Sequence, residues 1–315
     1  MDSVSIVRDT SRSGTDIIGD LRLEWSVCCD VGRVRETNED AALAMPGKYL
    51  LADGMGGHDS GELASETALM TLAAADSAGD LEATQIELIE LLGQAQDAIG
   101  RIESESDRRA GTTATGAVLV TEDGEPHWLV LNIGDSRTYR YQAGVLTQLT
   151  RDHSQVQELV DAGFITAEEA RTDPRRNVIT RALGAGMVDP AAEYFSTIAL
   201  PGDVLLVCSD GLTGELPDDE IAEILAGATN SEDAAETLVA SALAVGAHDN
   251  VTVIVVTVHD SVPTTQMPAV ADEGDPAADN ADSVDPDAAT GADADADAGD
   301  AETRAGEDDP VTDAT

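Results

Sequence analysis

Four aspartates of this chain stand where short apolar runs of the sequence end or begin. They are Asp53 after "KYLLA", Asp135 after "LNIG", Asp210 after "LLVCS" and Asp249 before "NVTVIVV". Because such runs are typical of buried strands, we expect these side chains at strand ends. Carboxylates gathered at one sheet edge raise each other's pKa unless cations join them. A single aspartate is more often a turn or cap residue, but four together favour a metal site.

The available ligand types narrow the identity of such an ion. Ligands that offer only oxygen suit hard cations, which indicates Mg²⁺ or Mn²⁺. Zinc is disfavoured because the five histidines are scattered and the cysteines, Cys28, Cys29 and Cys208, have the wrong spacing. The glycines that follow Asp53 in "DGMGG" indicate either a tight turn or a ligand that comes close to the backbone.

An arginine lies among acidic residues in "RVRETNED", residues 33–40. Arg35 precedes Glu39 and Asp40 by a few positions, just after the first predicted strand. An arginine beside an acidic metal cluster can hold a phosphoryl oxygen by paired N–H donors. An ordinary surface salt bridge is an equally good interpretation of this segment by itself.

Several enzyme classes are excluded by missing motifs. Lys48, the one lysine, follows no Gly-rich loop of the Walker type, and neither a kinase catalytic loop nor a G-x-S-x-G elbow is present. "DGMGGHDSG" departs from the dinucleotide-binding pattern because Asp59 takes the place of the last glycine.

Composition adds further limits. The 315 residues carry 62 acidic and 17 basic side chains, a net charge of −45, which would repel nucleic acid over most of the surface. Such acidity suits either a protein kept soluble at high salt or simply an acidic cytoplasmic protein. Without an apolar run of about 20 residues, no membrane span is predicted. We therefore expect a cytoplasmic protein whose cysteines are buried thiols.

Three segments differ in composition. Residues 1–22 are polar and aperiodic, and we expect a loose N-terminal arm. Residues 23–260 alternate between strand-like and helix-like patterns without a clear linker, which predicts one domain. Residues 261–315 hold 16 acidic residues and one arginine among Ala, Gly, Pro and Thr, which predicts an acidic disordered tail.

Within residues 23–260 the predicted helices form two blocks. The first covers residues 62–77, with Ser60 as a plausible cap, and 84–106; the second covers 218–227 and 231–247. Residues 112–150 between the blocks are typical of an antiparallel meander, because turn signals separate their apolar runs. This arrangement favours a layered α+β domain over a repeated βαβ unit.

Eight motifs in order resemble the bacterial branch of the metal-dependent serine/threonine protein phosphatases, the type 2C family. They are "RETNED", "LADGMGGH", "GTTAT", "NIGDSR", "LTRDHS", "ITRALG", "LLVCSDGL" and "HDNVTVIV", and they span about residues 23–259. The resemblance implies an α+β, four-layer α-β-β-α sandwich with two central antiparallel sheets and the metal site at one end. It also implies hydrolysis of phosphoserine and phosphothreonine in proteins by a metal-activated bridging water.

The resemblance assigns metal ligands residue by residue. Asp53 would bridge two Mn²⁺ or Mg²⁺ ions, the Gly54 carbonyl would ligate one of them, and Asp210 and Asp249 would complete the other. Asp135 would help Asp210 to hold a third, weaker ion.

Further roles come from the same resemblance. Arg35 would bind the phosphate, Glu39 and Asp40 would stand near the ion-bound waters, and Asn250 would orient Asp249. The position of a histidine in the eukaryotic members is Met55 here, so a protein proton donor is in doubt. His58 and His153 lie nearby in sequence, although a structural role is the more common one for each.

Residues 154–178 match the variable flap beside the site and bring Arg171, Arg175 and Arg176 into an acidic chain. Arg175 and Arg176 could guide phosphopeptides past the negative surface, or they could simply pair with surplus acids.

The expected partners follow from this interpretation. They are phosphorylated proteins and a cognate Ser/Thr kinase, with neither nucleic acid nor membrane, for an enzyme that acts as a monomer. Two other functions stay open: a phosphatase dedicated to one regulatory phosphoprotein, and a catalytically dead relative that only binds partners.

Overall fold

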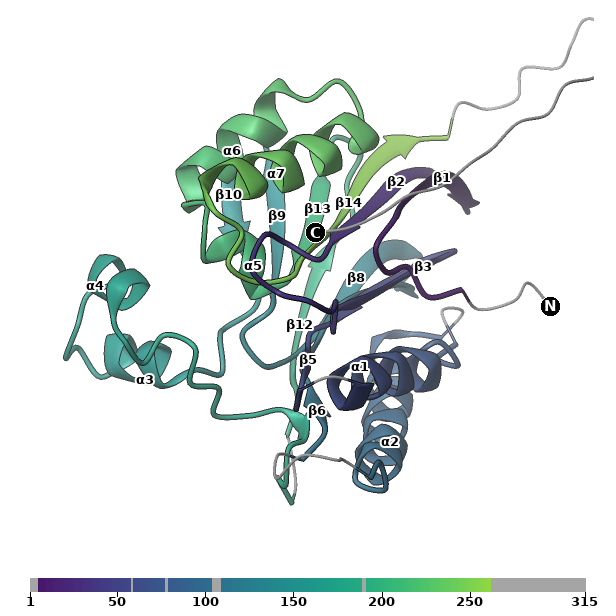
Figure 1. Cartoon of the computed structure of the whole chain (residues 1–315). Helices are drawn as coiled ribbons and strands as arrows, with labels where there is room; N and C mark the ends of the chain where they lie inside the picture. Colours follow the sequence, from purple (N-terminus) through teal and green to yellow (C-terminus); the bar gives the residue numbers. More distant parts are fainter. Residues whose placement is uncertain (1–4, 58, 77–78, 104–108, 189–190, 262–315) are drawn as a thin grey trace, which may run out of the picture. The chain divides into compact units, whose positions relative to one another are not determined.

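Residues 5–57, 59–76, 79–103, 109–188 and 191–261 are described in a computed structural model, in which they belong to one compact unit. They form the expected α+β sandwich of four layers, with two antiparallel sheets between two pairs of helices (Figure 1). The predicted helix blocks and the predicted closing strand are all present. Among the described residues no helix is long and apolar enough to cross a membrane.

One central sheet has six strands in the order β1-β2-β14-β13-β9-β10. Its strands are β1 (Ser11–Ile18), β2 (Leu21–Asp30), β9 (Arg137–Gln142), β10 (Val145–Gln148), β13 (Val204–Cys208) and β14 (Val251–Asp260). The other central sheet has five strands in the order β12-β8-β7-β4-β3. They are β3 (Ala41–Met45), β4 (Lys48–Ala52), β7 (Ala114–Glu122), β8 (Glu125–Ile133) and β12 (Glu193–Ile198). A small third sheet joins β5 (Gly54–Met55), β6 (Gly111–Thr112) and β11 (Leu183–Gly184).

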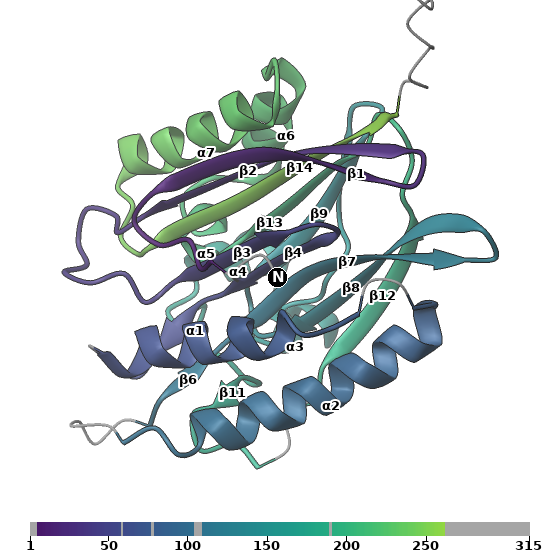
Figure 2. The same ribbon diagram turned by 90° about the vertical axis from the view of Figure 1, so that its right-hand side faces the viewer.

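The helices cover the outer faces of the two sheets (Figure 2). The five-stranded sheet packs against α1 (Asp59–Leu72) and α2 (Leu81–Ile99), and the six-stranded sheet packs against α6 (Asp218–Gly227) and α7 (Ser231–Val245). The remaining helices are α3 (Gln155–Asp161), α4 (Ala167–Thr172) and α5 (Asp210–Thr213). Side chains cap two long helices at their start: Asp80 accepts from the Ala83 amide, and Asn230 accepts from the Asp233 amide.

Successive side chains of the central strands alternate between two buried layers. On β14, Val253 and Val255 pack against the helices, while Ile254 and Val256 pack against the facing sheet. On β4, Leu50 packs against α1 and α2, while Leu51 enters the layer between the sheets. Burial on both faces explains why these strands are continuous apolar runs in the sequence.

Two expectations from the sequence are wrong. The loose arm of residues 1–22 contains β1, which pairs with β2 from Ser11↔Cys28 to Ile18↔Leu21. Its polarity reflects a sheet edge that faces solvent rather than a disordered chain. Ser60 is not the cap of α1, because the helix begins at Asp59 and Ser60 is buried within its first turn. The expected tail lies outside the described residues beyond Ser261.

The predicted meander crosses from one sheet to the other. Strands β7 and β8 pair within the five-stranded sheet, whereas β9 and β10 pair within the six-stranded sheet. After β10 the chain forms α3 and α4, which extend away from the layers (Figure 1). Only Val156 is buried in α3, and no residue of α4 is buried. This segment, which we call the flap (residues 154–178), therefore has little core of its own.

The layer between the sheets supports the strand that carries Asp53. Leu51 is fully buried there. Replacing it with alanine should lower the free energy of unfolding in urea by about 2–5 kcal/mol, because methyl groups are lost and a cavity is left. Leu63→Ala, at a half-exposed position of α1, is the control and should change it by no more than about 0.5 kcal/mol. Equal effects of the two changes would contradict the described core.

Candidate active site

The antiparallel pairing brings four strand ends to one edge of the sandwich. Because β4 pairs with β7 and β7 with β8, β4 and β8 end at the same side of their sheet. Asp53 follows β4 directly, and Asp135 follows β8 after one glycine. In the other sheet β13 pairs with β14, so Asp210 and Asp249 also share one end. The predicted gathering of acids is therefore present in the fold.

Asp53 and Asp210 come from different sheets, yet their carboxyl groups lie within hydrogen-bonding reach of each other. Burial raises the pKa of Asp53 well above its ordinary value, and the charges of Asp40 and Asp210 raise it further. Burial and then the charge of Asp249 raise the pKa of Asp210 to about 6. The two groups can be this close at neutral pH only if a proton or a cation offsets their repulsion.

Two further acids extend this cluster. Asp135 is buried, and its pKa is raised well above the ordinary value by burial and then by the charge of Asp210. Its Oδ1 atom is buried and has no hydrogen-bond partner among the described residues. Asp40 is also buried, and burial raises its pKa to about 7 although Ser209 and Thr252 donate hydrogen bonds to it. A buried carboxylate oxygen such as Asp135 Oδ1, which has no hydrogen-bond partner among the described residues and is surrounded by other acids, is well suited to bind a cation.

The donor set fits a hard divalent ion, but the side chains are not drawn together around one. Within the described ranges, no three His, Cys, Asp or Glu side chains are close enough as they stand to hold an ion. Arg35 Nη2 donates to Asp249 Oδ2 at 2.6 Å. Binding would require small movements of side chains that the strand ends already hold near each other.

Glycines next to the acids are explained by close packing of the backbone. A Cβ atom on Gly54 would collide with the carbonyl oxygens of Gly61 and Glu39, and one on Gly211 would collide with the Asn250 carbonyl. Gly56 and Gly57 have φ values of +133° and +83° and make the turn before α1. At Gly54 it is therefore the neighbouring backbone, rather than a turn or a ligand, that leaves no room for a side chain.

Asn250 connects the acidic cluster to the loop that carries Arg35. Its Nδ2 donates to the carbonyls of Val31 at 2.9 Å and Thr37 at 3.0 Å, and its Oδ1 accepts from the Glu39 amide at 2.9 Å. It is the backbone amide of Asn250, not the side chain, that donates to Asp249 Oδ1. The side chain therefore fixes the Arg35 loop, a role that differs from the expected orientation of Asp249.

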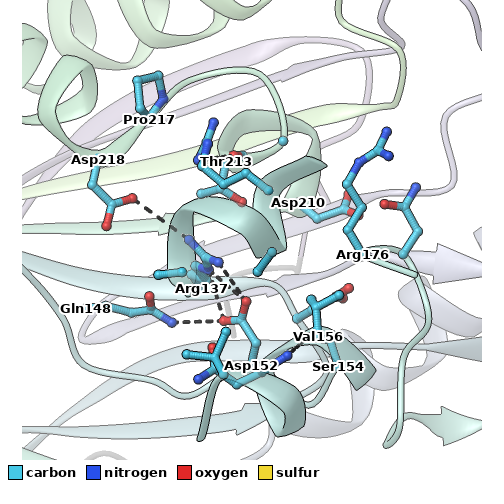
Figure 3. A pocket seen from close by; sticks show the side chains of 18 of the residues that line it. Arg137, Gln148, Asp152, Ser154, Val156, Arg176, Asp210, Thr213, Pro217 and Asp218 are labelled. Atoms are coloured by element: carbon cyan, nitrogen blue, oxygen red, sulfur yellow. Dashed lines mark hydrogen bonds and ion pairs between the residues drawn. The ribbon is translucent and has the colours of Figure 1, made fainter. Parts of the chain in front are cut away.

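A pocket of about 380 Å³ opens between the flap and α5 and reaches Asp135 and Asp210 (Figure 3). Arg171 and Arg176 both line it, and Arg171 Nη1 donates to the Thr213 carbonyl at 3.2 Å. Arg175 does not line it, because its side chain is bonded to Asp173 at 2.7 and 2.8 Å. The structure thus distinguishes Arg176, which lines the pocket, from Arg175, which does not, although the sequence predicted the same role for both.

The pocket also contains an ion pair, Arg137 with Asp152, for which the sequence predicted no role. Arg137 binds the carboxylate of Asp152 through Nε and Nη2 at 2.7 to 3.0 Å, and the two side chains face each other in Figure 3. Arg137 Nη1 also donates to the Tyr139 hydroxyl at 2.8 Å. The available signal was the position of Arg137 two residues after Asp135, within "NIGDSR".

Of the two nearby histidines, only His153 is among the described residues, and its Nδ1 contacts the backbone rather than the acids named above. His153 is buried, and its Nδ1 accepts from the Gly134 amide at 3.1 Å. Burial and then the charge of Arg181 lower its pKa, so the ring is held neutral and structural. His58 lies outside the described residues.

Comparisons with known proteins agree with this geometry. Residues 33–245 match the family model described as protein phosphatase 2C. The serine/threonine phosphatase stp of Listeria monocytogenes is 37% identical over 239 residues, which cover 72% of this chain and 92% of that protein.

Solved structures give the same result. A crystal structure of the serine/threonine phosphatase PstP/Ppp of Mycobacterium tuberculosis has a TM-score of 0.68 at 38% identity and covers 75% of this chain and 98% of that one. The catalytic domain of the protein phosphatase PstP in complex with two manganese ions has a TM-score of 0.65 at 36% identity, covering 76% of this chain and 100% of that one. The chain therefore belongs to the protein phosphatase 2C family, the metal-dependent serine/threonine protein phosphatases.

Proposed function

We propose that Asp53, Gly54 through its carbonyl, Asp210 and Asp249 hold two Mn²⁺ or Mg²⁺ ions at the edge where the two sheets meet. The observation that carries this proposal is the convergence of acids from both sheets, close enough to raise each other's pKa. Asp135, whose Oδ1 has no hydrogen-bond partner in the described part of the chain, would join Asp210 at a third and weaker position. When bound, the ions would supply Lewis-acid chemistry: they activate a water for attack on phosphorus and offset charge on the phosphoryl oxygens.

Arg35 has two roles in this proposal. Arg35 pairs with Asp249 at 2.6 Å, and its side chain is half exposed. With Asp249 committed to an ion, the guanidinium would instead hold the phosphoryl oxygens of a substrate by two N–H donors. Its loop stays in place because Asn250 binds the carbonyls of Val31 and Thr37.

We assign proton transfer to a water at the site. Met55 occupies the position next to Gly54, and His153 is bound to the Gly134 amide. In this scheme Glu39 and Asp40, both buried, would accept hydrogen bonds from water at the edge of the cluster. A water ordered in this way would protonate the departing serine or threonine oxygen.

The substrates in this proposal are phosphorylated proteins, and the enzyme opposes a cognate Ser/Thr kinase as a cytoplasmic monomer. A dedicated phosphatase of one regulator would use the same site and differ only at the flap pocket. A catalytically dead relative is disfavoured because Asp53, Asp210, Asp249 and Arg35 are all present.

Replacing Asp210 with asparagine tests the metal site. Mn²⁺-dependent hydrolysis of p-nitrophenyl phosphate should fall by roughly 100-fold or more, because several kcal/mol of charge stabilisation are lost. Without metal, the melting temperature should stay the same or rise, because one repelling charge is removed. Asp219→Asn, at an exposed position of α6, is the control. An Asp210→Asn variant as active as the wild type would refute the assignment.

Replacing Arg35 with alanine separates phosphate binding from metal binding. Loss of a charge-assisted hydrogen bond worth about 1.5–3 kcal/mol should raise the KM for p-nitrophenyl phosphate roughly 10- to 150-fold. Affinity for Mn²⁺, measured by calorimetry, should stay the same or increase because Asp249 loses a competing partner. Arg33→Ala, an exposed neighbour in the same loop, should change neither quantity. Weaker Mn²⁺ binding by Arg35→Ala would contradict the proposed exchange of partners.

The flap pocket predicts a difference between two adjacent arginines. Arg176→Ala should raise the KM for a phosphopeptide more than the KM for p-nitrophenyl phosphate, because Arg176 lines the pocket beside Asp210. Arg175→Ala should affect neither substrate, because Arg175 is paired with Asp173. Equal changes for both substrates in Arg176→Ala would show that the pocket does not contact the peptide.

A further inference from the structure

The segment Val7–Thr10 is built into the domain, although it precedes the family-matched range that starts at residue 33. Val7 is buried between the sheets and exchanges backbone hydrogen bonds with Ala42 at 2.9 and 3.1 Å. The Thr10 carbonyl accepts from the Cys29 amide at 3.2 Å. The segment therefore lies between β2 and the start of β3, directly behind the Glu39–Asp40 pair.

Arg8 makes four hydrogen bonds from this segment. Its Nε donates to the Asp40 carbonyl at 2.8 Å, and its Nη1 donates to Glu62 Oε1 at 2.8 Å. Its Nη2 donates to the Glu62 carbonyl at 3.1 Å and to Ser65 Oγ at 3.0 Å. The side chain is only 14% exposed, and two of the four acceptors are backbone carbonyls. The Arg8 contacts differ from a surface ion pair, because three of the four acceptors are uncharged and are matched by the planar shape of the guanidinium rather than by its charge.

The hydrogen bonds continue from Arg8 to the acidic pair. Ser65 Oγ donates to the Glu39 carbonyl at 2.6 Å, and the same carbonyl accepts from the Gly54 amide at 3.2 Å. Arg8 thus joins α1 to both peptide groups of the Glu39–Asp40 pair. Through the Glu39 carbonyl, the same network reaches the backbone that follows Asp53.

We propose that Arg8 is a positioning residue that fixes the Glu39–Asp40 backbone against α1, so that the acidic cluster needs only small side-chain movements to bind its ions. This role rests on the proposed metal site and adds a contribution from a segment outside the family match. Arg8 touches neither the ions nor the phosphate in this scheme. Its loss should therefore weaken metal binding and lower kcat while the KM for substrate, which depends on Arg35, stays unchanged.

The test compares Arg8→Ala, Arg8→Lys and Ser65→Ala with the wild-type chain. Calorimetric titration with MnCl₂ gives the Kd for Mn²⁺ without any substrate, and p-nitrophenyl phosphate gives kcat and KM. Groups that support metal ligands typically contribute 10- to 100-fold, so Arg8→Ala should weaken Mn²⁺ binding about 10-fold or more and lower kcat at limiting Mn²⁺. Excess Mn²⁺ should restore most of kcat.

Matched variants separate geometry from charge. Arg8→Lys keeps the charge but not the planar fork, so its Mn²⁺ affinity should fall between those of Arg8→Ala and the wild type. Ser65→Ala breaks the link to Glu39 with no change of charge and should also weaken Mn²⁺ binding. Arg12→Ala, at an exposed position of β1, should match the wild type.

The outcomes distinguish this role from the proposed function. If the wild type binds Mn²⁺ and hydrolyses substrate while Arg8→Ala does both equally well, the positioning role is overturned and the metal site stands. If the Arg8→Lys variant and the Ser65→Ala variant each bind Mn²⁺ as tightly as the wild type, the positioning role is also overturned, even if Arg8→Ala fails to fold. A wild type that neither binds Mn²⁺ nor hydrolyses substrate overturns both proposals.

Discussion

Repulsion between closely spaced carboxylates is the constraint on which the rest of this structure depends. Asp53 and Asp210 lie within hydrogen-bonding reach, and Asp40, Asp135 and Asp249 surround them. Burial and neighbouring negative charges raise the pKa of Asp40, Asp53, Asp135 and Asp210, so the cluster opposes its own formation in the absence of cations. The fold must therefore hold these side chains together by interactions that do not involve the carboxylates. The buried apolar layers and the backbone hydrogen bonds provide those interactions.

Those forces act on the main chain beside each acid. The Asp53 carbonyl accepts from the Thr113 amide and the Thr112 hydroxyl, each at 2.9 Å, and the Asp53 amide donates to Thr113 Oγ1 at 2.9 Å. Gly54 and Gly211 let neighbouring carbonyls approach more closely than any side chain would allow. The backbones beside Asp53 and Asp210 are therefore held by contacts that do not involve the carboxylates. Rigid support of this kind is what a site needs if little energy is to be spent on ordering it.

The flap contrasts with this rigid edge. Its helices bury one apolar residue between them, whereas the strands that carry the acids are buried on both faces. Low burial is typical of segments that adapt to different partners. A site with fixed acids and an adaptable neighbouring wall can keep one reaction while its preference for peptides changes. The separation of Arg176, at the pocket, from Arg175, paired with Asp173, follows from the local path of this segment.

The sequence by itself determined the local elements and the chemistry of the site. Apolar runs of period two and helical stripes reflect burial, which is a local property, so the strands that end at Asp53, Asp135 and Asp210 could be predicted. The order of eight motifs also indicated the family and the arrangement in four layers. Arg35 could be proposed because arginine among acids suits a phosphate ligand.

Only the tertiary structure decided which segments meet. The meander divides between two sheets after β8, and β1 pairs with β2 although its sequence is polar, because neither choice leaves a periodic signal. Likewise Gly211 is required by the distant carbonyl of Asn250, and Arg8 reaches Asp40 across 32 positions of sequence. Contacts of this kind depend on packing between elements that are far apart in the chain. A pattern within one segment reports how that segment is buried, but not what it is buried against.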